Sequence, residues 1–223
     1  MTLVLYLDTL LVPLSLFLTL GYHALLWRIF KNKPLQTAVG AHAMRIRAWL
    51  EDMKQGDDKK GMLAVQSLRN TILTTIVSAA VAIILTLSLA ALTNDAYNAS
   101  SHLFANWFFG SKSDGFLVLK YGSASFFLLV SFWCSSMALG CLIDANFLVN
   151  SPLMAGGEFS VSSGHTEWVV EKGLILAVMG NRMLCLAFLL LLWLMGPVPV
   201  SLASVALIFG LYEIDFGGRF CSK

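Results

Sequence analysis

The chain has 223 residues, of which 57% are hydrophobic and 13% are charged, and its mean hydropathy is +0.75. Soluble domains carry about 25% charged residues. This composition excludes a disordered chain and a nucleic-acid-binding module, and four cysteines without a CxxC pair exclude a disulfide-stapled secreted domain. We therefore expect an integral membrane protein whose first partner is the lipid bilayer, with no role in binding nucleic acid.

Four stretches without charged residues are long enough to cross a bilayer, which needs about 20 apolar residues. They cover residues 9–27, 70–94, 121–143 and 183–212. Backbone groups cannot stay unpaired in hydrocarbon, so each stretch is expected to be a helix. The prediction is one all-α transmembrane domain, residues 1–223, a bundle of four helices at about 4–27, 70–93, 117–143 and 183–212.

The fourth stretch, 30 residues long, exceeds what one straight helix needs, and the motif Gly196-Pro197-Val198-Pro199 interrupts it. One interpretation is a single helix that is kinked or tilted. The other is a helical hairpin with a fifth pass, which would place Arg182 near the middle of its first helix. A central Arg costs about 2.5–3.5 kcal/mol on insertion scales, and this cost favours four passes.

The first loop, residues 28–69, holds nine of the 15 Lys and Arg residues. The positive-inside rule places this loop in the cytoplasm or its equivalent, with both termini on the opposite side if there are four passes. Within the loop, Val39, Ala43, Ile46, Leu50 and Met53 form an apolar stripe that predicts an amphipathic helix over about 37–54. This helix lies either in the headgroup plane or over the cytoplasmic end of the bundle.

Polar and small residues recur every four positions along the second helix, beginning with Gln66, Asn70, Thr74 and Ser78. Small and hydroxylated residues permit close helix packing and interhelical hydrogen bonds. The stripe is therefore either a packing interface or the wall of a path for water or a solute.

The four-helix topology brings several polar residues to one depth, near the cytoplasmic ends of the helices. Ionisable groups near hydrocarbon usually face the interior and pair, so Asp144 is expected to pair with Arg69 or Arg182. The cluster either fixes the depth of the helices or binds an anionic group such as a lipid headgroup. Its members are His23, Arg69, Asp144, Asn146, Asn181 and Arg182.

The chain contains no HExxH, GxSxG, P-loop or GxGxxG motif, and its histidines show no metal-ligand spacing. We predict no catalytic residues, no cofactor and no metal site.

Several segments together resemble the DUF599 family of plant, algal and bacterial membrane proteins, which has no established biochemical function. The most specific is LAVQSLRN at residues 63–70. The resemblance covers nearly the whole chain in order and implies a four-pass helical protein without assigned catalytic residues. The other segments are YLD at 6–8, LVP at 11–13, YH at 22–23, RAW at 47–49, NFLVN at 146–150 and LWLMGPVP at 192–199.

Three functions fit these observations. The one that the sequence favours is an accessory or structural subunit of a membrane assembly, with the polar stripe buried against a partner. The second is a channel or transporter for a small solute or ion, which four helices could form only as an oligomer. The third is a lipid-binding or lipid-acting protein that uses His23 and the arginines. The expected protein partners are further copies of the chain or other membrane subunits.

Overall fold

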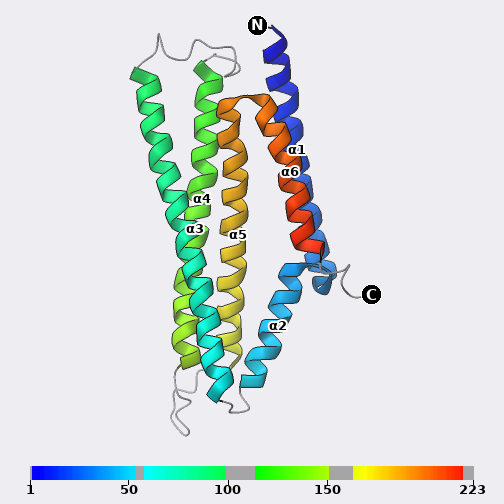
Figure 1. Ribbon diagram of the computed structural model, residues 1–223, viewed down its shortest axis with the longest axis vertical. Helices are drawn as coiled ribbons and strands as arrows, with labels where there is room; N and C mark the ends of the chain where they lie inside the picture. Colours follow the sequence, from blue (N-terminus) through cyan, green and yellow to red (C-terminus); the bar gives the residue numbers. More distant parts are fainter. Residues whose placement is uncertain (1, 54–57, 99–113, 151–162, 218–223) are drawn as a thin grey trace.

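The structure, a computed structural model, describes residues 2–53, 58–98, 114–150 and 163–217, which are all helical apart from short connections. This agrees with the predicted all-α fold. Figure 1 shows the elements in chain order. They are α1 (Thr2–Asn32), a short 3-10 helix η1 (Pro34–Gln36), α2 (Ala38–Met53), α3 (Asp58–Asn98), α4 (Asp114–Asn150), α5 (Ser163–Met195) and α6 (Pro197–Phe216).

Within the described residues, five helices are long and apolar enough to cross a membrane: α1, α3, α4, α5 and α6. Large apolar side chains also point outward from them, for example Phe17, which is 75% exposed, and Leu202, which is 69% exposed. In water such surfaces would be costly, whereas lipid solvates them. The chain is a multi-pass integral membrane protein.

The preferred four-pass count is corrected to five, because residues 183–212 belong to two helices. The chain reverses at Gly196, whose φ of 139° is accessible to glycine but strained for other residues. Pro197 then occupies the first turn of α6, where its missing N–H removes no helical hydrogen bond. The first helix of this hairpin, α5, also begins at Ser163, well before the predicted start at residue 183.

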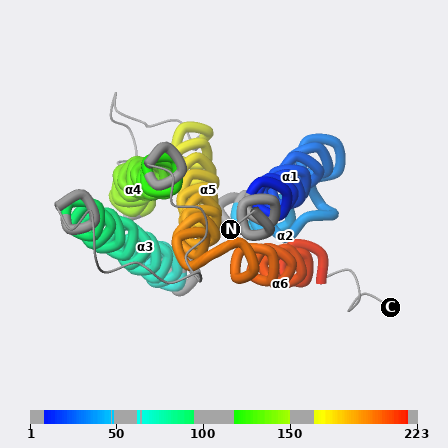
Figure 2. The backbone as a smooth tube through the Cα atoms, turned by 90° about the horizontal axis from the view of Figure 1, so that it is seen from above, coloured from blue at the N-terminus to red at the C-terminus, as the bar shows by residue number. Residues whose placement is uncertain are grey.

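The helices form two groups that meet along α5 (Figure 2). One group is α3, α4 and α5, and the other is α1 and α6, which run side by side in the same direction. Close packing of α4 on α5 depends on small residues. A Cβ atom added to Gly180 would lie 2.5 Å from Ser135 Oγ, and Ser131 Oγ donates a hydrogen bond of 2.7 Å to the carbonyl oxygen of Gly180.

The bundle has two ends, which differ in the segments that lie there. The turn end holds the start of α1 and the turn at Gly196, and the α2 end holds α2, the start of α3 and the end of α4 (Figure 1). Because five helices cross the bundle, α1 begins at the turn end and α6 runs towards the α2 end. The first and last described helices therefore start at the same end, so an odd number of passes replaces the even number expected.

Helix α2 packs against α5 and α6 and does not stand apart from the bundle. Its start is fixed by Thr37, whose hydroxyl accepts a hydrogen bond from the backbone N–H of Gly40 and donates one to the carbonyl of Pro34. Gly40 has no room for a side chain, because a Cβ atom there would meet the Pro34 carbonyl. Of its apolar stripe, Val39, Ala43 and Ile46 are half-buried, as expected for a helix that covers the bundle, and the side chains of Leu50 and Met53 lie outside the described part.

Candidate functional site

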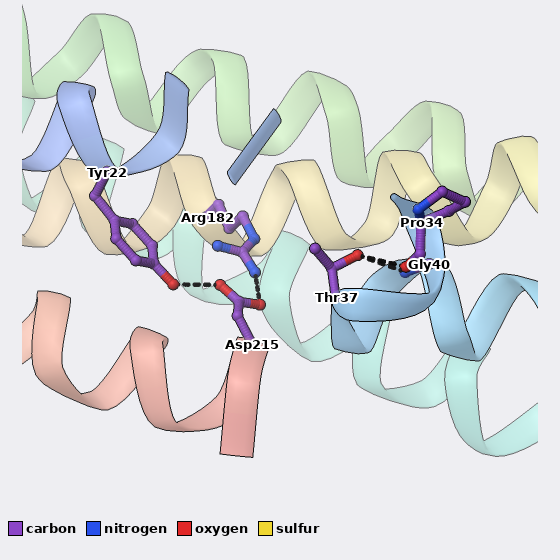
Figure 3. A network of polar contacts seen from close by, with 6 residues as sticks. All are labelled: Tyr22, Pro34, Thr37, Gly40, Arg182 and Asp215. Carbon is purple, nitrogen blue, oxygen red and sulfur yellow. Dashed lines mark hydrogen bonds and ion pairs between the residues drawn. The ribbon is translucent and has the colours of Figure 1, made fainter. Parts of the chain in front are cut away.

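A buried ion pair joins α5 to α6 and is the main polar feature of the bundle (Figure 3). Arg182 Nη2 lies 2.5 Å from Asp215 Oδ1, and the Asp215 side chain is only 1% exposed. The second carboxylate oxygen, Oδ2, accepts a hydrogen bond of 2.6 Å from the hydroxyl of Tyr22 on α1. Asp215 thus ties together three helices from both groups.

The pair lies inside the membrane-spanning part of α5. Arg182 stands ten residues after Lys172 and 14 before Gly196. At 1.5 Å per residue, these separations are about 15 Å and 21 Å. The bond from Ser131 to Gly180 gives the same depth on α4, because Ser131 is near the middle of the charge-free stretch between Lys120 and Asp144. Ionisable residues at such depth are costly and usually mark functional sites.

The partner Asp215 explains how Arg182 is tolerated at this depth. The insertion cost that favoured four passes applies to an unpaired Arg, and pairing with a carboxylate that also accepts from Tyr22 offsets part of it. Glu213 and Asp215 follow the last apolar stretch in the sequence. These two acidic residues suggest a counter-ion for Arg182 only when the segment after Gly196 is taken as a separate helix that returns beside α5.

A groove of about 420 Å³ leads from the α2 end to this ion pair. Helix α5 contributes one wall, α3 and α6 flank it on one side (Figure 2), and α2 lies at its mouth. Glu167, Glu171 and His42 line the mouth, and Asn181, Arg182 and Asp215 line the deep part. Carboxylates, an amide and an ion pair therefore lie along a single groove whose lining is otherwise mostly apolar, and its deep end lies at the level of Asp215, near the end of α6.

The α3 wall of the groove consists of hydroxyl groups that all donate to their own helix. Each hydroxyl proton is given to the backbone carbonyl four residues earlier, so the remaining lone pairs can only accept hydrogen bonds. The groove wall is therefore a row of hydrogen-bond acceptors. It is formed by Thr71, Thr74, Thr75 and Ser78.

Only part of the predicted polar stripe on α3 lines the groove. Thr74 and Ser78 line the groove, together with Thr71 and Thr75, which the four-residue spacing did not include. Gln66 and Asn70 are exposed and are not among the residues that line it. An i+4 row winds around a helix, so its members cannot all face one groove.

The six residues of the predicted cytoplasmic-side polar cluster do not all lie together. Asn181 and Arg182 lie together in the groove, and His23 lies on the other side of Arg182 in a separate cavity. Arg69 and Asp144 are exposed, and Arg182 pairs with Asp215 instead of Asp144.

Helix α4 explains why Asp144 and Arg182 are apart. Gly180 contacts Ser131 and Ser135, so Arg182 lies near the level of Ser131, about 13 residues away from Asp144 along α4. The half-buried Asn146 follows Asp144 at the α2 end. The cluster was inferred from four passes that all end at one boundary, and the fifth pass moves Arg182 away from that boundary.

Among the described residues, no group of three or more His, Cys, Asp or Glu side chains could hold a metal ion. The arrangement offers hydrogen bonding and charge, without a nucleophile paired to a base.

Comparisons with known proteins add a family but no activity. No curated protein and no solved structure matches the sequence significantly. A family model described as "Protein of unknown function, DUF599" matches residues 10–219, nearly the whole chain. The chain belongs to the DUF599 family.

Proposed function

We propose that this protein is a carrier that binds a small polar solute in the groove between α3, α5 and α6. The observation that carries the proposal is a groove with a row of α3 hydroxyls that ends on the buried ion pair of Arg182 and Asp215. A structural subunit needs no such hollow, whereas carriers enclose polar sites between their membrane helices.

The rest of the bundle limits how far the groove extends towards the turn end. On the turn side of Arg182, buried apolar side chains from α1, α3, α4, α5 and α6 pack together, and the buried Lys120 lies over the Trp193 ring. Their members are Val12, Leu89, Ala124, Leu128, Ala187, Leu190, Trp193 and Val200. A groove that ends at a packed cluster of this kind is the arrangement expected of one state of a carrier.

The groove chemistry defines the class of solute. The α3 hydroxyls accept hydrogen bonds, and both oxygens of Asp215 already accept from Arg182 and Tyr22. A solute that donates hydrogen bonds, such as a polyol, an amine or an amide, complements this wall. We propose that the α2 end faces the cytoplasm, because most Lys and Arg residues belong to the loop that contains α2, and Arg219 and Lys223 follow α6.

Cysteine accessibility tests whether the groove contains water. In a chain without its native cysteines, Ser78→Cys places a thiol in the groove, and Leu73→Cys places one on the lipid-facing side of the same helix. Leu73 is five residues nearer the α2 end, so depth alone favours its labelling. We expect a membrane-impermeant methanethiosulfonate applied at the α2 end to react faster with Ser78→Cys. Equally slow reaction at both positions would refute an aqueous groove.

Flux through proteoliposomes tests transport itself. We expect osmotic swelling with at least one of glycerol, urea and choline to exceed that of protein-free vesicles. Thr74→Leu should reduce the flux by filling the groove with an apolar side chain, whereas Leu73→Ala should not. No flux for any of the three probes, together with unreactive Ser78→Cys, would overturn the carrier proposal.

A subunit role is the second candidate, because the groove opens sideways between α3 and α6, where a helix of another chain could lie. Native mass spectrometry of the purified protein separates the two. A complex of copies of this chain alone supports a carrier, and a fixed complex with unrelated chains supports a subunit.

A further inference from the structure

A second cavity lies across Arg182 from the groove, between α1 and α5. Its volume is about 190 Å³, far more than the roughly 30 Å³ that one water occupies. Its walls are mostly apolar and include two aromatic rings, Trp27 and Phe30, and two methionines, Met179 and Met183. Thr37, at the start of α2, lies at its edge.

Two buried polar atoms in residues that line this cavity have no hydrogen-bond partner in the described part of the chain. They are Nε2 of His23 and Nη1 of Arg182. Each such atom costs about 1–3 kcal/mol when it stays unsatisfied. Both atoms are closed to a water-sized probe, so a ligand in the cavity supplies the missing bonds only when the His23 and Arg182 side chains turn towards it.

The protonation of His23 follows from its other nitrogen. Nδ1 lies 2.7 Å from the backbone carbonyl oxygen of Thr19, which can only accept, so Nδ1 carries a proton. Nε2 is therefore an acceptor in the neutral ring and a donor in the imidazolium. Arg182 Nη1 is a donor in every state.

We propose that this cavity binds the acid group of an amphipathic oxyacid, with one oxygen on Arg182 Nη1 and another on His23 Nε2. A carboxylic acid accepts from Arg182 and donates to neutral His23, and a carboxylate accepts from both residues when His23 is charged. Since Asp215 already balances Arg182, the site stays neutral in either case. Neutrality limits the cost of burial in the membrane.

The apolar walls define the rest of the ligand. Pockets with few polar groups among apolar and aromatic ones bind molecules with one polar end. The acid could come from the membrane, as a fatty acid, or from water, as a small aromatic acid. The site adjoins the groove, and the two share Val39, Ile175, Val178 and Arg182. Its α1 wall belongs to it alone, and binding there does not require the groove to conduct a solute.

Binding of decanoate to the whole protein in nanodiscs, measured by native mass spectrometry, tests the proposal. Decan-1-ol has the same chain without the acid, and benzoate has the acid without the chain. We expect decanoate to bind and decan-1-ol not to bind. Benzoate displacing decanoate at equal concentration supports the same site with a water-soluble acid as ligand, and failure to displace supports a membrane acid.

A matched pair of variants links binding to His23. His23→Asn keeps a group at the Nδ1 position, which can bond to Thr19, and removes Nε2. His23→Gln keeps a donor near the Nε2 position. We expect His23→Asn to weaken decanoate binding about 10- to 100-fold, the range for one hydrogen bond to a charged group, and His23→Gln to restore most of it. The lipid-facing variant Leu202→Ala should bind as the unchanged protein does.

The outcomes separate this inference from the carrier proposal. Binding of decan-1-ol as tight as that of decanoate, no binding of either acid, or unchanged binding by a folded His23→Asn variant would each overturn the acid site. None of these results changes the reactivity of Ser78→Cys, which depends on the groove alone.

Discussion

The ion pair between Arg182 and Asp215 is the feature whose loss the structure predicts most directly. Removing Arg182 leaves a carboxylate that is 1% exposed with only the Tyr22 hydroxyl as partner. Breaking one side of a buried pair costs about 3–5 kcal/mol, because the remaining charge is uncompensated. We expect Arg182→Met and Asp215→Asn each to lower the free energy of unfolding by that amount.

The double variant gives the stronger test. Arg182→Met combined with Asp215→Asn removes both charges, so it should be more stable than the sum of the two single losses predicts. The interaction energy of this double-mutant cycle should be at least about 2 kcal/mol, within the range for residues of one network. Steric trapping in bicelles measures the free energy of unfolding without removing the protein from lipid.

Glu213→Gln is the matched control, because Glu213 is an exposed carboxylate on the same turn of α6. Surface substitutions usually change stability by no more than about 0.5 kcal/mol. A loss in Arg182→Met as small as in Glu213→Gln would refute the buried pair. Additive losses in the double variant would refute the contact between the two residues.

Three further predictions concern the remaining contacts. Tyr22→Phe removes one hydrogen bond to Asp215 and should cost about 0.6–1.7 kcal/mol in the same assay, the range for membrane helices; no loss would contradict the bond. Gly180→Ala should lower the thermal stability in detergent because its Cβ atom would collide with Ser135, whereas Gly140→Ala, where nothing lies within 4 Å, should not; equal effects would contradict the α4–α5 packing. Tags at the two chain ends should be protected from protease on opposite sides of the membrane, and protection on the same side would restore an even number of passes.

The membrane location, the helical fold and the break near Gly196 could be predicted from the sequence. These properties depend on local composition, because about 20 apolar residues, a scarcity of charge and a Gly-Pro motif act on each segment separately. The amphipathic pattern of α2 was likewise local, and its 3.6-residue period indicated a helix before its packing partner was known.

The number of passes could not be decided in this way. The cost of a central Arg182 argued against the hairpin, and that cost is offset by Asp215, 33 residues further along the chain. A pairwise interaction of this kind has no local signature. The contact joins Arg182 on α5 to the end of α6, two helices whose reversal is set by the turn at Gly196.

Composition and hydropathy predicted a helical membrane protein and singled out Thr74, Ser78, Asn181 and Arg182 as polar residues in or near its spans, without saying which of them meet. The packing of the helices shows that these four share a groove and that His23 lines a second cavity, in which Arg182 alone of the four takes part. The physical reason is that burial of apolar segments in lipid is set segment by segment, whereas a site requires side chains from several helices to meet at one depth and on facing sides. That alignment is fixed by close contacts such as Gly180 on Ser135 and by the single counter-ion Asp215.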